Sequence, residues 1–244
     1  MREVAVVVPA YNEARLLPGT LGALAAQTDR DFTLVVVDNA STDATAEIAA
    51  GFPGEVEVVG EPEPGAGTAA DTGFRYAISR GATKLLRTDA DCLPAPDWVA
   101  TARSLLDAHD LVCGRSVPRA DERPGWAHRV LYPLVVRLAA RAGRWLHRSP
   151  SARAPFVLVH GHNLAITAAL YERCGGTPRE ALGDGAEDVT LLNRARQHSA
   201  RIVRAEHLVV QTSLRRLRAW GGLRTLLWHW DRRYRPAPEE VHVR

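Results

Sequence analysis

Two aspartates, Asp89 and Asp91, are the residues of this sequence whose type and spacing most directly suggest chemistry. They follow a short apolar run that ends at Leu86, and a single alanine separates them. If that run is a strand, both carboxylates lie at its carboxyl end, where open α/β sheets bind their ligands. Carboxylates in that place can hold a hard divalent cation together with a substrate diphosphate. An isolated Asp-x-Asp is also common in solvated turns, so the interpretation depends on the rest of the chain.

Three other loops carry polar or small residues directly after expected strands: Pro9 to Glu13, the loop that starts at Asp38, and Gly65 to Thr68. They supply an aromatic ring for a base, a carboxylate for a base edge or ribose, and a Gly-rich approach to the backbone. With the two aspartates, these loops are the components of a nucleotide-diphosphate pocket.

The elements that must position these loops alternate between strand and helix in the first half of the chain. Apolar, β-branched runs predict strands, and leucines or alanines at helical spacing predict helices between them. Asn12 is expected to cap the first helix, and Ser41 or Thr42 the second. The expected strands are 4–8, 32–37, 55–59 and 84–88, and the expected helices begin near residues 13, 43 and 68. This pattern predicts a Rossmann-like, mostly parallel sheet with helices on both faces.

The second half of the chain is less regular. Helices are expected over 96–108, 127–147, 187–197 and 214–234, and strand-like segments over 111–117, 156–166 and 201–210. A Pro-rich turn is expected after Asp91. We find no internal repeat and no long linker, so we expect one domain over 1–234 and a tail over 235–244.

The composition of the 244 residues is that of a soluble globular protein, with 46% hydrophobic and 24% charged residues and a net charge of +3. The three cysteines have neither metal-ligand nor disulfide-framework spacing, which favours a reducing compartment. Neither a signal peptide nor a run of about 20 apolar residues is recognised, so a cytoplasmic protein is expected, free or peripheral at the membrane. The arginines lack interleaved aromatic residues, so no nucleic-acid partner is expected.

Five segments, taken in order, resemble the family 2 glycosyltransferases, which have the GT-A fold. The segments are 6–13, 35–43, 88–91, 161–166 and 185–191, and the similarity extends to about residue 216. The resemblance implies an α/β protein with a single GT-A domain. Residues 1–117 would bind a nucleotide sugar, and residues 118–234 would bind the hydroxyl acceptor.

The resemblance also implies roles in the donor half. Tyr11 would stack on the base, and Asp38 would accept a hydrogen bond from it. Asp91 would be the principal ligand of Mn²⁺ or Mg²⁺, with Asp89 directed toward ribose or metal. The other residues expected at the nucleotide sugar are Pro9, Glu13, Gly67 and Asp71.

In the acceptor half, Asp188 matches the general base of the family. Inverting transfer needs a carboxylate that deprotonates the acceptor hydroxyl opposite the leaving diphosphate. Without the resemblance, Glu187 and Asp188 would be ordinary acidic residues at a helix N-terminus. Glu187, His162 and Asn163 would contact the acceptor. His207 is a candidate third metal ligand.

One departure from the family pattern concerns the donor. The family commonly has Ala-Arg-Asn before a glycine, whereas residues 69–73 read Ala-Ala-Asp-Thr-Gly. Arg75 or Arg87 could take over the missing arginine, although an ordinary surface position is the simpler interpretation of each. Ser213, Arg215 and Arg216 resemble a late basic motif of the family, and a solvated helix start explains them equally well. UDP is expected rather than GDP.

An Arg-rich amphipathic stretch over 127–148 permits two interpretations. It is either an ordinary surface helix or a peripheral contact with an anionic membrane, which a lipid-linked acceptor would suit. The alternative functions are a sugar-phosphate nucleotidyltransferase, which needs a Gly-rich loop after its first strand, and a non-catalytic nucleotide- or glycan-binding scaffold of the same fold.

Overall fold

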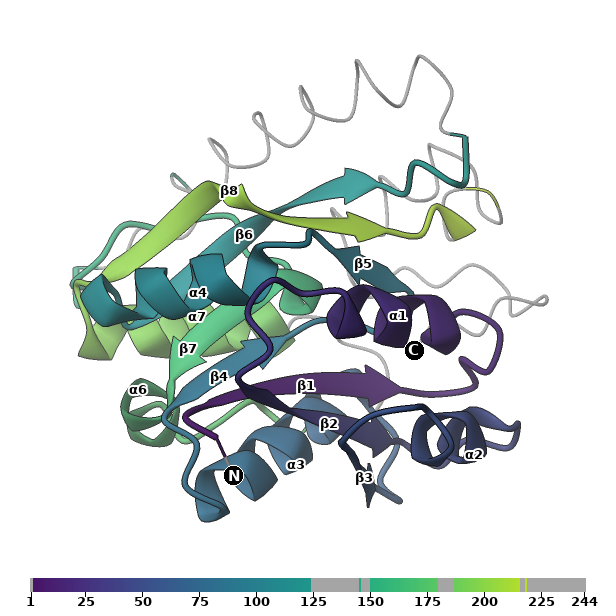
Figure 1. The fold of residues 1–244 in the computed structure, drawn as a ribbon. Coiled ribbons are helices and arrows are strands. Elements are labelled where there is room, and N and C mark those ends of the chain that lie inside the picture. Colours follow the sequence, from purple (N-terminus) through teal and green to yellow (C-terminus); the bar gives the residue numbers. More distant parts are fainter. Residues whose placement is uncertain (1, 124–144, 146–149, 180–186, 216–217, 219–244) are drawn as a thin grey trace.

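The first half of the protein forms a parallel sheet in a computed structural model, which describes residues 2–123, 145, 150–179, 187–215 and 218 (Figure 1). Its β-branched runs form strands that are buried most completely in the centre of the sheet, where β1 is buried along its whole length. These strands are β1 (Val4–Ala10), β2 (Phe32–Asp38), β3 (Val56–Gly60) and β4 (Lys84–Arg87). Helices α1 (Leu17–Ala25), α2 (Thr45–Ala50) and α3 (Ala66–Ser79) connect them.

The second half extends the same sheet in mixed directions. The strand order is β3-β2-β1-β4-β7-β6-β8-β5; β7 is antiparallel to β4 and β6, and β8 is parallel to β6. The elements are β5 (Cys92–Pro94), α4 (Trp98–Ala108), β6 (Leu111–Pro118), β7 (Leu164–Thr167), α6 (Ala168–Arg173), α7 (Glu187–His198), β8 (Ile202–Thr212) and a 3₁₀ turn, η1 (Gly161–Asn163).

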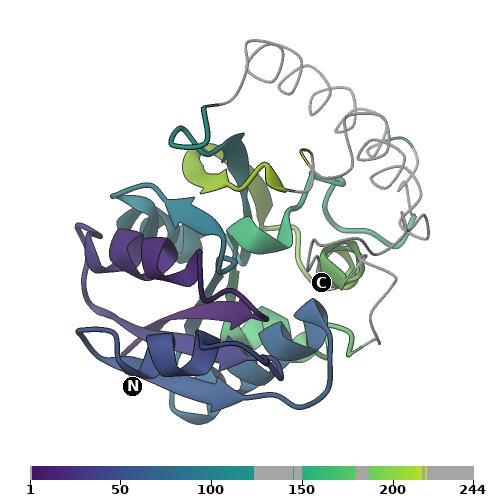
Figure 2. The same ribbon diagram turned by 90° about the vertical axis from the view of Figure 1, so that its right-hand side faces the viewer.

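Helices cover both faces of this sheet, as the strand pattern predicts. One apolar cluster joins the strands to α3, α6 and α7, and a second joins them to α1, α2 and α4. In Figure 2, α1 and α7 lie on opposite sides of the central strands. The α/β fold class predicted from the sequence is confirmed.

Several local predictions were wrong for identifiable reasons. Asn12 does not cap α1, because it has a left-handed backbone (φ 52°) and its Oδ1 accepts the amide of Thr42 at 2.8 Å. Neither Ser41 nor Thr42 caps α2, which begins at Thr45. Residues 92–94, expected in a turn, form β5 because β8 offers them a partner. Residues 156–160, expected in a strand, are irregular and lead into η1.

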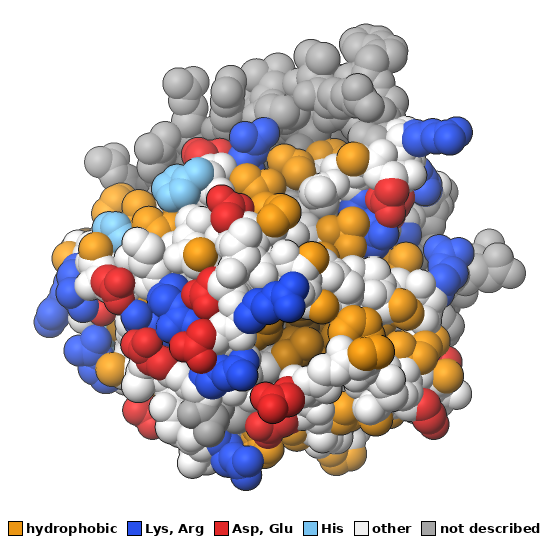
Figure 3. All heavy atoms as spheres, in the orientation of Figure 1, with side chains coloured by type: hydrophobic (Ala, Val, Ile, Leu, Met, Phe, Trp, Pro, Cys, Tyr) orange, Lys and Arg blue, Asp and Glu red, His pale blue; other side chains and the backbone are white. Residues whose placement is uncertain are grey.

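The expected helices over 127–147 and 214–234 fall almost entirely outside the described residues. Among the helices that the structure does describe, none is long and apolar enough to cross a membrane. On the face shown in Figure 3, acidic and basic side chains are intermixed rather than separated by sign. The division into a donor half (1–117) and an acceptor half (118–234) stays a prediction.

Candidate active site

The carboxyl ends of β1, β2 and β4 meet at one edge of the sheet. Ala10 is opposite Asp38 in the register of β1 and β2, and Val7 is opposite Arg87 in that of β1 and β4. Pro9 lies inside β1, so Tyr11 leaves the sheet beside the end of β2. The predicted donor loops are therefore neighbours in space.

Side chains of the loop after β2 and of the first residue of α2 hold the loop after β1. The amides of Asn12, Glu13 and Ala14 donate to Ser41 Oγ (3.0 Å), Thr45 Oγ1 (2.8 Å) and Asp43 Oδ2 (3.1 Å). Three consecutive bonds of this kind fix Tyr11 next to the Asp38 loop.

Asp38 has an unsatisfied acceptor at this edge. Its Oδ1 is buried and has no hydrogen-bond partner within the described part of the chain. The hydroxyls of Thr68 and Thr88, on the helix after β3 and directly after β4, are in the same condition. Buried polar atoms are rarely left unpaired, so an N–H group of a bound ligand is a natural partner for Asp38. This arrangement fits the base of a nucleotide.

A second group of acidic side chains surrounds Asp91. Arg215 Nη2 lies 3.2 Å from Asp91 Oδ2 and also pairs with Glu13 Oε1. Burial raises the pKa of Glu13 above its ordinary value, and the negative charges of Asp91 and Asp89 act in the same direction, against Arg215. The guanidinium of Arg215 thus lies between two carboxylates, in a position that would also suit a metal cation.

These oxygen ligands fit a hard divalent cation. The Asp91 and Asp89 side chains are 15% and 35% exposed, so both remain accessible. Within the described ranges, no three His, Cys, Asp or Glu side chains gather to hold a metal ion on their own. One or two carboxylates completed by substrate phosphates are the usual Mg²⁺ arrangement with nucleotide substrates.

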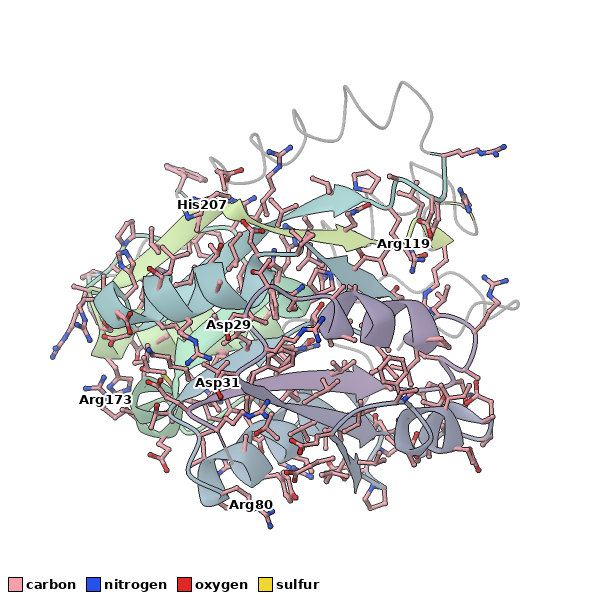
Figure 4. The ribbon with its side chains drawn as sticks, viewed as in Figure 1. Asp29, Asp31, Arg80, Arg119, Arg173 and His207 are labelled. Atoms are coloured by element: carbon pink, nitrogen blue, oxygen red, sulfur yellow. The ribbon has the colours of Figure 1, made fainter. Side chains whose placement is uncertain are left out.

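His207 does not join this group. It is an exposed residue in the middle of β8, whereas Arg119 is hydrogen-bonded to Thr212 at the carboxyl end of that strand (Figure 4). Arg119 Nη1 also donates to the backbone oxygen of Asp91 (3.3 Å). The third-ligand interpretation of His207 is therefore corrected, because the strand carries its imidazole away from the aspartates.

On the acceptor side, α7 begins with Glu187 and Asp188. Asp188 is buried, and its Oδ2 and Oδ1 accept the amides of Gly161 (3.1 Å) and Val189 (2.7 Å). A Cβ added at Gly67, at the start of α3, would lie 3.0 Å from Glu187 Cβ. The absence of a side chain at Gly67 lets the predicted catalytic helix pack directly against the donor half.

Two histidines flank the Gly161 amide. The rings of His160 and His162 are stacked at 5.4 Å between centroids, and His162 Nε2 is 2.6 Å from Ser116 Oγ. His162 is thus beside the segment that bonds to Asp188, and its contact with the acceptor stays a prediction.

Two other predicted site residues lie in the core. Asp71 is fully buried and accepts hydrogen bonds from Tyr171 (2.7 Å) and Arg75 (2.8 Å). Asn163 is fully buried as well, and it bonds to the Trp98 indole and to the carbonyl oxygens of Arg115 and Leu208. Both residues connect distant segments of the fold and present no surface to a ligand, which corrects the expected contacts.

Arg87 was interpreted as a surface residue, and this was wrong. Its side chain is only 4% exposed and lies between Asp89 (Nε to Oδ1, 3.2 Å) and Glu187 (Nη2 to Oε1, 3.7 Å). Burial opposes its charge, but the carboxylates of Asp89, Glu187 and Asp188 prevail and raise the pKa of Arg87. Its place between Leu86 and Asp89, at the end of an apolar strand, could have indicated that Arg87 is buried.

Comparison with known proteins identifies the family. The model of the family described as "Glycosyl transferase family 2" matches residues 5–173, which is more than half of the chain. The chain belongs to glycosyl transferase family 2. The family match covers the donor loops, Asp89 and Asp91, and the Gly161 segment, and it ends before Glu187.

Relatives of this family 2 protein include an uncharacterized glycosyltransferase of Mycobacterium tuberculosis, 33% identical over 73% of this chain and 77% of the relative. Validoxylamine A glucosyltransferase of Streptomyces hygroscopicus is 30% identical over 80% of this chain. The alignment spans 51% of that enzyme, so this chain matches about half its length.

Among solved structures, this family 2 protein is similar to a mannosyltransferase of Pyrobaculum calidifontis in complex with GDP-Man and Mn²⁺. The TM-score is 0.65 at 28% identity, over 90% of this chain and 59% of the other. The match agrees with the GT-A fold expected for the chain, and glycosyltransferase activity follows from the family.

Proposed function

We propose that this glycosyltransferase transfers a sugar from a nucleoside-diphosphate sugar to a hydroxyl acceptor, with inversion and with a divalent cation. The observation that carries the proposal is the placement of Glu187–Asp188 against the edge where Asp38, Asp89 and Asp91 meet. Glu187 contacts that edge through Gly67 and Arg87. An acceptor beside Asp188 would thus face a donor bound across the strand ends.

The reaction requires few protein groups. The acceptor oxygen attacks C1 of the sugar, its proton passes to Asp188, and the bond from C1 to the diphosphate oxygen breaks. Attack opposite the leaving group inverts the configuration at C1. A divalent cation held by Asp91 and Asp89 would neutralise charge on the departing diphosphate.

On the donor side, Asp38 would bind the base and Tyr11 would stack on it, with Pro9, Glu13 and Gly67 lining the nucleotide sugar. UDP remains the proposed nucleotide, and the GDP-Man complex of the mannosyltransferase makes GDP the alternative to test. The hydroxyl acceptor is proposed to be either a small molecule or a lipid-linked compound. The relatives include a validoxylamine A glucosyltransferase and an undecaprenyl-phosphate mannosyltransferase. Peripheral membrane contact through 127–148, at the cytoplasmic face, is part of the proposal, and all of that segment except Trp145 lies outside the described residues.

A thermal-shift screen tests the donor proposal. UDP-glucose, UDP-N-acetylglucosamine and GDP-mannose are each added with and without MnCl₂, beside UTP, GTP and sugar 1-phosphates. At about 100 times its dissociation constant, a donor should stabilise the fold by ~2.7 kcal/mol, which raises Tm by roughly 5–10 °C for a chain of this size. Stabilisation by a nucleoside triphosphate, without a response to any nucleotide sugar, would favour the nucleotidyltransferase instead. If the protein binds a nucleotide sugar but does not cleave it, the result would favour the non-catalytic binding scaffold.

Replacing Asp38 by Ala should weaken nucleotide binding even without a metal ion. The buried Oδ1 is expected to accept a hydrogen bond from the base. Hydrogen bonds to charged groups contribute ~1.5–3 kcal/mol, so affinity for the free nucleoside diphosphate should fall about 10- to 100-fold. Calorimetric titration without Mn²⁺ measures this, and Asp31→Ala, at an exposed site, is the matched control. A loss confined to the Mn²⁺-dependent part of binding would show that the role of Asp38 is misassigned.

Replacing Arg215 by Gln should strengthen binding of Mn²⁺ alone. The guanidinium competes with a metal ion for Asp91 and Glu13. Removing a cation at this distance should tighten the Mn²⁺ dissociation constant by about three- to tenfold, because like charges repel. Electron paramagnetic resonance of free Mn²⁺ gives this constant directly. Arg218→Gln, which removes a pair with Glu122, should change nothing. Weaker Mn²⁺ binding to Arg215→Gln would mean that Arg215 orders the site instead of competing for it.

A further inference from the structure

Arg87 connects the donor side of the site to the acceptor side. It is the last residue of β4, and its Nε lies 3.2 Å from Asp89 Oδ1. Its Nη2 lies 3.7 Å from Glu187 Oε1, at the first residue of α7. One side chain therefore contacts a predicted metal or ribose ligand and the residue adjoining the predicted base.

The same guanidinium supports the segment that bonds to Asp188. A Cβ added at Gly161 would lie 3.1 Å from Cζ and Nη1 of Arg87, so the glycine backbone lies directly on the guanidinium. The Gly161 amide donates to Asp188 Oδ2 at 3.1 Å. A shift of Arg87 would therefore change the positions of Asp89, Glu187 and Asp188 together.

A buried arginine is a costly way to fill the core. Taking an ion out of water costs several kcal/mol, and an ion pair offsets this only when its geometry is good. The two residues before it in β4, Leu85 and Leu86, show that apolar side chains fit this strand. The charge at Arg87 has a specific function if it keeps neighbouring carboxylates close together that would otherwise repel one another.

We propose that Arg87 is a positioning residue of the transfer reaction, which fixes the Glu187–Asp188 end of α7 relative to Asp89. The inference rests on the proposed function and deepens it. Arg87 touches neither the donor nor the acceptor in this scheme and acts through the carboxylates on either side. Misplacement of a catalytic group by about 1 Å can cost on the order of 100-fold in rate, so the expected effect is on turnover.

The test is a double-mutant cycle on Arg87 and Glu187. The variants are Arg87→Met, Glu187→Gln, both together, and Arg87→Lys. Arg103→Met is the matched control, because it removes a partly buried arginine from its 2.7 Å pair with Asp29, outside the site. Nucleotide release from the donor identified by the screen gives kcat and KM, and calorimetry gives the Mn²⁺-dependent donor dissociation constant.

Arg87→Met should lower kcat by about 30-fold or more and change the donor dissociation constant by less than about threefold. Arg87→Lys should recover part of the rate, because a charge remains between the carboxylates. The double variant should be no more than about threefold slower than Arg87→Met, since both changes break one interaction. Arg103→Met should behave as wild type.

Multiplication of the two single effects in the double variant would overturn the proposal, as would a wild-type kcat for Arg87→Met. If Arg87→Met does not fold, Arg87→Lys replaces it in the cycle, and Arg87→Lys, Glu187→Gln and the combination of these two are compared by the same criterion. Hydrogen exchange without ligand is the second measurement, and Arg87→Met or Arg87→Lys should exchange faster than wild type at 161–163 and 187–191. If the Arg87 variants exchange faster but the wild-type protein cleaves no nucleotide sugar, the proposed function is overturned and the positioning contact of Arg87 still holds. Unchanged exchange would overturn the positioning role itself.

Discussion

Asp188→Asn should lower sugar transfer by about two orders of magnitude or more and leave donor affinity near wild type. A general base contributes to the chemical step, typically 10²- to 10⁴-fold, and not to ground-state donor binding. Asparagine keeps the shape of the side chain and one oxygen for the Gly161 amide, but it cannot take up a proton. The rate of nucleotide release and the donor dissociation constant, measured on the same preparation, separate the two effects.

Glu187→Gln is the companion variant for this experiment, because it removes the adjacent carboxylate and leaves Asp188 intact. A near wild-type rate for Asp188→Asn would place the base elsewhere, and Glu187 would be the first residue to test. Loss of donor binding in Asp188→Asn would instead mean that the start of α7 belongs to the nucleotide site.

Asp91→Ala should abolish the Mn²⁺-dependent part of donor binding while the protein stays folded. The remaining carboxylates, Asp89 and Glu13, offer fewer hard oxygen ligands, and Glu13 would remain paired with Arg215. The substitution relieves repulsion with Asp89 and Glu13 but also breaks the pair with Arg215, which keeps Glu13 as a partner, so Tm should change little. Calorimetric titrations with and without Mn²⁺ measure the binding, and a thermal melt measures the fold.

Asp97→Ala is the matched control, because Asp97, like Asp91, lies between β4 and α4. It is exposed and makes no capping hydrogen bond to α4. Its Mn²⁺-dependent binding should equal that of wild type. If donor binding is unaffected both by Asp91→Ala and by chelation of the metal, no metal ion takes part in donor binding.

The parallel half of the fold could be predicted because its information is local. Runs such as Val4–Val8 form strands from their own side-chain preferences, and the loops that follow must meet at one edge. Strand β5 could not be predicted, because its three residues become a strand only by pairing with β8, more than 100 residues away in the chain. The conformation of Asn12 could not be predicted either, because its hydrogen-bond partner Thr42 belongs to another loop.

The same distinction between local and long-range information applies to the residues of the candidate site. Asp38, Asp89 and Asp188 could be proposed from motifs, since each motif lies at the end of a strand or the start of a helix. Asp71 and Arg87 could not be assigned from their own neighbourhoods. The first is buried by Tyr171, 100 residues away, and the second pairs with Glu187, also 100 residues away. Motif position alone could not show which polar residues face a ligand and which bind other parts of the protein.

The most direct test of the central claim is to find which bond of the nucleotide sugar breaks. The donor identified by the screen is incubated with the wild-type protein and Mn²⁺ in ¹⁸O-enriched water without added acceptor, and the products of slow hydrolysis are examined by mass spectrometry. Cleavage between C1 and the diphosphate oxygen predicts unlabelled nucleoside diphosphate and ¹⁸O in the released sugar. Label in a phosphate, or release of nucleoside monophosphate with sugar phosphate, would contradict a glycosyl-transfer site built from Asp38, Asp91 and Asp188.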